Sequence, residues 1–387
     1  MCYTRRVGEF MTIFEYIDDF GDYTFNDRVF NEVDSMIFSF LSYINFQNVI
    51  INGKESIESV GKRLFLDDKK INKIIIAEND ALKIYKSIMN KKRYKDCLLF
   101  NYVYEVDNES QFSAISIEYL KNHLYISYEG TDEMISGWYE DFLFSYQYPT
   151  KSHLNGINYL KKYTFTNYSI IVGGHSKGGN IALVSSMNTN FLVRRKITDI
   201  YSFDGPGILP SVFNSRKYKR IKNKYYHIVP ETSLVGVLLE NSKDIVIKTS
   251  INGILAHDVI YWDISNNYIT RSKLSYFSKT LKKDLNNYIY SLTNEELEDV
   301  IGKFYNICNK IDIKSIIDFS NDNSKIILFL KEVSKLDIRS RRILINIIDI
   351  FIKALSKSIS FKVRDNVDKL KEKIKYELKF ETKKIHR

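Results

Sequence analysis

Cysteine and proline are both scarce in this 387-residue chain, and each scarcity limits the kinds of protein that the chain can be. Four prolines stand beside 28 tyrosines and 24 phenylalanines, which is typical of a folded protein rather than a disordered one. The three cysteines, Cys2, Cys97 and Cys308, are far apart and lack the spacing of metal ligands. An odd number of separated thiols favours a reducing compartment.

Long apolar runs are missing as well. The first residues have no apolar segment of the kind found in signal peptides. The most apolar stretch, 343–355, is interrupted by Asp349 and Lys353 and is too short to span a bilayer. No internal repeat or low-complexity linker is present. These absences predict a soluble, cytoplasmic protein.

The net charge of +10 does not by itself identify a partner. Lys, Ile, Asn and Tyr are abundant throughout, as in proteins from A/T-rich genomes. The basic residues are spread over the chain without a nucleic-acid-binding motif, so no nucleic acid is expected. The excess is largest at 357–387, with eleven Lys or Arg against five Asp or Glu. Apolar residues at helical spacing there predict a basic amphipathic helix, which would either contact an anionic membrane or, more commonly, pack on its own domain.

The most informative segment is Gly174-His175-Ser176-Lys177-Gly178, a Gly-x-Ser-x-Gly motif. An apolar, β-prone run precedes it at 168–172, and a segment that can begin a helix follows at 180–184. This order predicts a nucleophile elbow, in which a serine occupies a strained turn between a strand and a helix. The turn would lift Ser176 Oγ out of the sheet and aim the Lys177 amide at a developing oxyanion.

Three regions differ in pattern. Residues 1–95 are predicted to form a helical N-terminal cover, 96–273 an α/β core, and 274–387 a charge-rich helical region. Within the core, strands alternate with helices, which predicts a mostly parallel, doubly wound sheet of the α/β class, and the elbow favours an α/β-hydrolase fold. The expected strands are 111–118 paired with 123–128, the nucleophile strand, 199–203, 224–229 and 244–248.

A serine nucleophile needs a histidine as base, and in α/β hydrolases that histidine comes last along the chain. His227, His257 and His386 follow Ser176. His386 is near the chain end, and His227 lies within a strand-like run, where a structural role is expected. His257 follows the final expected strand, at the position of the hydrolase histidine loop. We therefore predict that His257 is the base.

Two carboxylates are candidates for the acid that orients His257. Asp204 follows the strand 199–203 and enters a Gly-Pro-Gly turn, and Glu231 follows the next strand. Asp204 is preferred because a short side chain at a strand end holds its carboxylate more rigidly, although an aspartate in such a turn can simply cap nearby amides. Glu231 is the alternative. A second oxyanion donor is expected from Thr131, which follows the strand 123–128 in the segment Gly130-Thr131-Asp132.

Joined in this order, the motifs resemble the class 3, or fungal-type, lipase-like α/β hydrolases over about residues 20–270. Gly-Thr followed by Trp138 and Asp141 resembles one segment of those lipases, and Gly-His-Ser-x-Gly-Gly resembles their elbow. The chain is most similar to a bacterial lipase-like family of largely unassigned function, which shares His-Ser-Lys-Gly-Gly-Asn, Phe-Asp-Gly-Pro-Gly and Ser-Leu-Val-Gly. The resemblance implies Ser176 as nucleophile, His257 as base, and Thr131 with Lys177 as oxyanion donors.

The chain departs from the lipase pattern at two positions. Ser233-Leu234-Val235-Gly236 stands where class 3 lipases carry their acid in Asp-x-Val-Pro, and Glu129 stands where they usually have arginine. The segment Asp204-Gly205-Pro206-Gly207 instead resembles lipases whose acid follows the preceding strand, which favours Asp204. We expect a carboxylic ester hydrolase acting on a lipid-like acyl ester, without metal or organic cofactor. The rival hypothesis, a non-catalytic lipid-binding or protein-interaction module on a hydrolase scaffold, rests on the missing acid motif.

Overall fold

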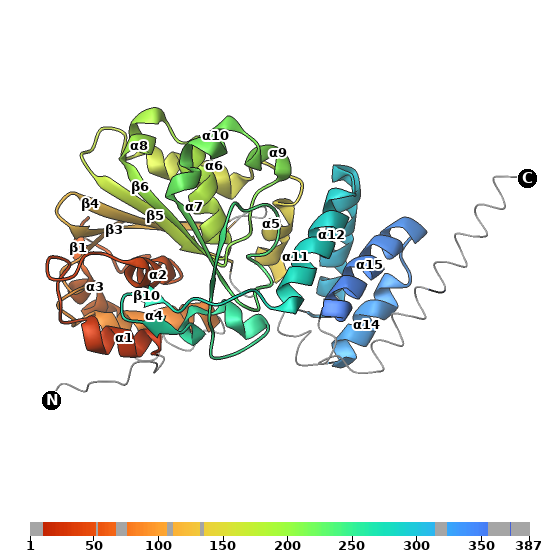
Figure 1. Ribbon diagram of the computed structural model, residues 1–387, viewed down its shortest axis with the longest axis horizontal. Coiled ribbons are helices and arrows are strands. Elements are labelled where there is room, and N and C mark those ends of the chain that lie inside the picture. Colours follow the sequence, from red (N-terminus) through yellow and green to blue (C-terminus); the bar gives the residue numbers. More distant parts are fainter. Residues whose placement is uncertain are drawn as a thin grey trace, which may run out of the picture. The chain divides into compact units, whose positions relative to one another are not determined.

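The computed structural model describes residues 11–51, 53–66, 76–106, 111–131, 135–313, 323–354 and 372. The chain forms two compact units, residues 1–132 with 149–275, and residues 133–148 with 276–387 (Figure 1). No helix in the described ranges is both long and apolar enough to cross a membrane. The three-part domain division expected from the sequence stays a prediction, and the basic helix expected at 357–387 lies outside the described residues.

An eight-stranded sheet forms the centre of the first unit, with its strands in sequence order. Strands β1 to β4 are antiparallel to their neighbours, and β4 to β8 run parallel. The strands that the sequence predicted are confirmed, including the antiparallel pair now seen as β3 and β4. The strands are β1 (Glu55–Ser56), β2 (Leu98–Val106), β3 (Gln111–Leu120), β4 (His123–Tyr128), β5 (Ser169–His175), β6 (Ile197–Phe203), β7 (Tyr225–Pro230) and β8 (Asp244–Ile247).

Helices cover both faces of this sheet (Figure 1). One face carries the central helix α7, which packs on β5 and β6, and the other carries α2, which packs on β4 and β5. Figure 1 shows α6, α8, α9 and α10 on the α7 side and α1, α3 and α4 on the α2 side. The helices are α1 (Ile13–Phe20), α2 (Glu32–Leu41), α3 (Ile57–Leu64), α4 (Ile76–Ile88), α6 (Lys151–Lys161), α7 (Lys177–Asn188), α8 (Phe191–Lys196), α9 (Pro210–Phe213) and α10 (Arg216–Ile221).

The N-terminal helices belong to the same core as the sheet. Ile37 and Phe38 of α2 are fully buried in one hydrophobic cluster with Tyr125 of β4 and Phe203 of β6. Because α2 lies directly on the parallel strands, apolar burial makes the N-terminal segment an integral layer of the first unit.

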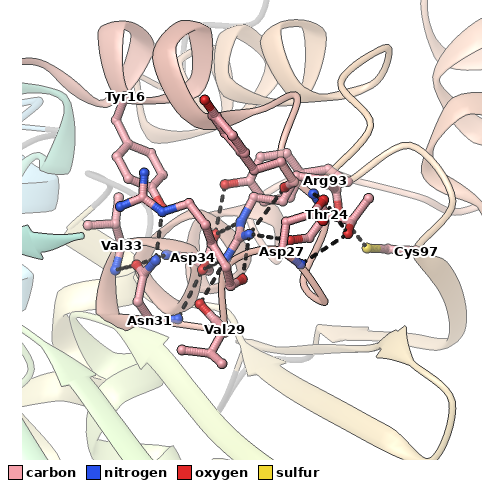
Figure 2. Close-up of polar contacts among 12 residues, drawn as sticks. Tyr16, Thr24, Asp27, Val29, Asn31, Val33, Asp34, Arg93 and Cys97 are labelled. Carbon is pink, nitrogen blue, oxygen red and sulfur yellow. Dashed lines mark hydrogen bonds and ion pairs between the residues drawn. The ribbon is translucent and has the colours of Figure 1, made fainter. Parts of the chain in front are cut away.

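A buried ion pair joins this layer to the segment after α4. Figure 2 shows Arg93 and Asp34 at the centre of a hydrogen-bonded network. Arg93 binds Asp34 through two nitrogens, Nε to Oδ1 at 2.8 Å and a terminal nitrogen to Oδ2 at 2.6 Å. The same guanidinium donates to the carbonyls of Arg28 and Val29, and Tyr94 also donates to Asp34. Shared donors and acceptors allow both charges to be buried.

The second unit is helical. Its helices bury Val300, Ile307, Phe329 and Ile343 in a separate core. α5 belongs to it, although α5 follows the strand β4 of the first unit along the chain. The helices are α5 (Ile135–Leu143), α11 (Tyr276–Tyr290), α12 (Asn294–Lys310), α14 (Asn323–Val333) and α15 (Ile338–Ala354).

Candidate active site

Three candidate residues lie at one edge of the sheet, where the parallel strands end. Ser176 follows β5, Asp204 follows β6 and Glu231 follows β7. The carboxyl ends of parallel strands meet at a common edge, where α/β proteins place their ligand sites. The Ser176 amide donates to the Phe203 carbonyl at 2.9 Å, so the serine lies beside the residue that precedes Asp204.

Ser176 adopts a strained backbone between β5 and α7. Its φ of 53° and ψ of −130° are unfavourable for a residue with a side chain. The turn also brings the helix against the end of β4, because a Cβ built on Gly178 would lie 2.1 Å from the Tyr128 carbonyl oxygen. Only glycine fits there. This strand, tight turn and helix have the geometry expected of a nucleophile elbow.

Asp204 and His257 form a direct pair. Asp204 Oδ2 lies 2.6 Å from His257 Nδ1, and the carboxylate is fully buried while the imidazole is 24% exposed. A carboxylate only accepts, so His257 donates from Nδ1, and in the neutral ring the lone pair is on Nε2. That is the tautomer a general base requires.

The Ser-Leu-Val-Gly segment supplies donors to this acid. Ser233 Oγ donates to Asp204 Oδ1 at 2.5 Å, and the Gly236 amide donates to the same oxygen at 3.1 Å. A Cβ at Gly236 would lie 2.4 Å from that oxygen, so the close approach needs glycine. The segment that stands in place of the lipase acid motif therefore holds the carboxylate of Asp204. Sequence reasoning missed this role.

Glu231, the alternative acid, has other contacts. Its carboxylate accepts a hydrogen bond from Ser272 Oγ at 2.8 Å, and its backbone pairs with Ile247 and Ser275. The structure thus brings Asp204 to His257, whereas the Glu231 carboxylate is bound by Ser272.

His175, the residue before Ser176, forms a second link to His257. Its Nε2 donates to the His257 backbone carbonyl at 2.8 Å, which leaves Nδ1 to accept from the Tyr43 hydroxyl at 2.8 Å. The centroids of the two imidazole rings lie 4.4 Å apart. Burial, together with the nearby His257, holds the pKa of His175 well below its usual value, so this ring stays neutral.

The turn that contains Asp204 is held on both sides. Asn180 of α7 donates to the carbonyls of Pro206 at 3.1 Å and Gly207 at 2.6 Å. His227 Nε2 donates to the Gly205 carbonyl at 2.9 Å, and its Nδ1 lies 2.9 Å from Asp244. His227 thus has a structural contact within the turn, and the asparagine of His-Ser-Lys-Gly-Gly-Asn fastens the elbow helix to it.

The two expected oxyanion donors lie in different segments, Lys177 at the start of α7 and Thr131 after β4. Lys177 is the first residue of α7, so its amide lies at the N-terminal end of the helix. Its side chain is buried and points elsewhere, donating from Nζ to the Gln111 carbonyl at 2.8 Å. Thr131 is buried after β4, beyond the segment that contacts Gly178. Within the described residues, no group of three or more His, Cys, Asp or Glu could hold a metal ion.

Comparison with known proteins places this site in a family. The chain is 17% identical to a crystal structure of M37 lipase, with a TM-score of 0.32, over 52% of this chain and 67% of that one. No curated protein matches. The model of the family described as Mbeg1-like matches residues 88–306, which include the elbow, Asp204 and His257. Because this match covers more than half of the sequence, the chain belongs to the Mbeg1-like family.

Proposed function

We propose that this protein is a serine hydrolase of the α/β-hydrolase type that cleaves a carboxylic ester, with a lipid-like acyl ester as substrate. One observation carries the proposal: a serine at positive φ on a strand-to-helix elbow shares a sheet edge with an Asp204–His257 pair. Leu255, two residues before His257, is 42% exposed, which suits an apolar acyl chain.

Each residue then has a defined task. Ser176 Oγ attacks the ester carbonyl carbon while His257 Nε2 takes its proton, and Asp204 stabilises the imidazolium. The amide of Lys177 and Thr131 donate to the oxyanion of the tetrahedral intermediate. When that intermediate collapses, the alcohol leaves with the proton from His257. Water then cleaves the acyl-serine by the same steps.

Labelling with a fluorophosphonate tests this proposal, because the reagent phosphonylates an activated serine. The unaltered protein should be labelled, and Ser176→Ala should abolish both labelling and ester turnover. Ser186→Ala is the matched control, because Ser186 is a buried serine on the same helix and should leave labelling intact. An unlabelled protein, with detergent present and across neutral pH, would overturn the proposal in favour of a non-catalytic lipid-binding or interaction module.

Tyr43→Phe should lower ester turnover several-fold without abolishing it. The change leaves the buried Nδ1 of His175 without its donor, which costs about 1–3 kcal/mol, and loosens the contact between His175 and the His257 backbone. Tyr85→Phe is the control, since the buried Tyr85 hydroxyl donates to Ile57 elsewhere in the same layer. Both variants should melt at lower temperature. Equal turnover in the two variants would restrict Tyr43 to a purely structural role.

A further inference from the structure

The positive charge of the chain is not spread evenly, as the sequence pattern suggested: besides the basic end of the chain at 357–387, a second segment carries a large excess of cations. Residues 142–230 contain thirteen Lys or Arg and only two acids, Asp199 and Asp204. Thirteen cations and two acids give this segment a net charge of +11, slightly more than the +10 of the entire chain. The remaining residues are therefore close to neutral in sum.

Both acids of this segment lie away from its outer surface. Asp204 is fully buried beside His257. Asp199 lies on β6 two and four residues before Tyr201 and Phe203, and Phe203 packs in the core shared with the N-terminal helices. Because side chains alternate along a strand, Asp199 faces α2 rather than α7. The layer of helices that covers the α7 side thus carries only cations from its own segment.

We call the Lys and Arg side chains of α8, α10 and the 3-10 turn η2 (Lys222–Lys224) the basic layer. Helices α8 and α10 both lie on the α7 side of the sheet (Figure 1). Lys217 of α10 donates to Asn188, at the end of α7, at 2.8 Å. Lys224 donates to the carbonyl of Ile197, directly after α8, at 2.5 Å. These contacts hold α10 against the end of α7, which precedes α8, and η2 against the first residue of β6, which follows α8.

The cations of the basic layer are not neutralised by nearby carboxylates. Lys196, Lys217 and Lys224 donate to carbonyl or amide oxygens, which carry no net charge. Arg216, Lys219, Arg220 and Lys222 are exposed. Among the described residues, no side chain of the basic layer has an ion pair. Its positive potential is therefore available to an anionic partner.

Large apolar side chains stand out of the same surface. Phe165 is 94% exposed, Phe191 59% and Leu192 48%. Phe165 lies in the turn after α6, and the backbone carbonyls of the residues before and after it accept hydrogen bonds from Lys196. The guanidinium carbon of Arg195 lies 5.4 Å from the centroid of the Phe191 ring. Exposed apolar groups gathered in one place mark an interaction site. Apolar side chains next to cations are suited to the headgroup region of an anionic bilayer, which accepts aliphatic as well as aromatic side chains. A single-stranded nucleic acid would instead need aromatic side chains for base stacking, and Leu192 cannot stack on a base.

We propose that the basic layer, with Phe165, Phe191 and Leu192, is a docking surface for an anionic lipid bilayer. It is separate from the candidate active site. Phe165 precedes β5 and α8 leads into β6, whereas Ser176 follows β5, and a strand of this length spans roughly 20 Å. The proposal does not depend on ester hydrolysis.

Vesicle binding by the full chain tests this surface. The triple variant Lys219→Gln, Arg220→Gln, Lys222→Gln should bind vesicles of phosphatidylcholine with about one third phosphatidylserine roughly 100-fold more weakly. The pair Phe165→Ser, Phe191→Ser should also weaken binding at unchanged charge. The matched control, Lys86→Gln, Lys92→Gln, Lys279→Gln, removes three exposed lysines outside the basic layer. It should change affinity only a few-fold, and all variants should keep the melting temperature of the unaltered protein.

Several outcomes would overturn the proposal. One is that the unaltered protein does not bind anionic vesicles, or that it binds neutral vesicles equally well. Another is a control variant that loses as much affinity as the triple variant, which would make net charge alone responsible. A third is a Phe165→Ser, Phe191→Ser variant that binds vesicles as the unaltered protein does but loses affinity for a single-stranded oligonucleotide, which would identify a nucleic-acid surface instead.

Discussion

Asp204→Asn is expected to lower ester turnover by roughly 10³ to 10⁴-fold with little change in stability. Ser233 and Gly236 both donate to Oδ1, so the oxygen of an asparagine would occupy that position. Its amide nitrogen would then face His257 Nδ1, where Oδ2 now accepts at 2.6 Å. The imidazole would have to carry its proton on Nε2 and could no longer take the proton of Ser176. Turnover of a soluble ester and the melting temperature measure the two effects.

Glu231→Gln is the matched control, because it removes a second carboxylate at the same sheet edge. Its side chain accepts from Ser272, and we expect a mild effect on turnover. A larger loss in Glu231→Gln than in Asp204→Asn would transfer the orienting role to Glu231. Equally mild effects in both variants would indicate a serine–histidine dyad, and would contradict the role proposed for Asp204.

Arg93→Met is expected to lower the free energy of unfolding by about 3–5 kcal/mol. The side chains of Arg93 and Asp34 are 1% and 0% exposed, so the substitution leaves a buried carboxylate without its counter-charge. Several backbone carbonyls around the pair also lose their donor (Figure 2). Denaturant titration measures the loss.

Two further variants separate charge from geometry in this pair. Arg93→Lys keeps the charge but cannot form the two-nitrogen contact with Asp34, so an intermediate loss is expected. Lys62→Met removes one member of an exposed i,i+4 pair with Glu58 and should change stability little. If Arg93→Met were as mild as Lys62→Met, the buried network would not be the link that holds the N-terminal layer.

The sequence alone determined the features that depend on short stretches of backbone. Glycine at both flanks of Ser176, after an apolar run and before a helix-forming run, is a local pattern, and the strained elbow is a local conformation. The strands β3 to β8 were likewise predictable because their apolar runs are bounded by turns. Asp204 was predictable as a candidate because it follows a strand of the parallel sheet, and His257 because it follows the last expected strand. The charge count of residues 142–230 was also available from the sequence, but had no meaning until the helices were known to share one face.

Other features were decided only by the tertiary structure. Tyr43 reaches His175 across 132 positions, and Arg93 reaches Asp34 across 59. Neither contact has a local signal, because a hydrogen-bonding partner is set by how a helix packs on a sheet rather than by its neighbours in the chain. The same holds for Ser233 and Gly236, whose motif lacks the expected acid and instead donates to an acid from another strand. Burial makes such pairs specific, since a polar group removed from water must find its partner wherever the fold has brought one.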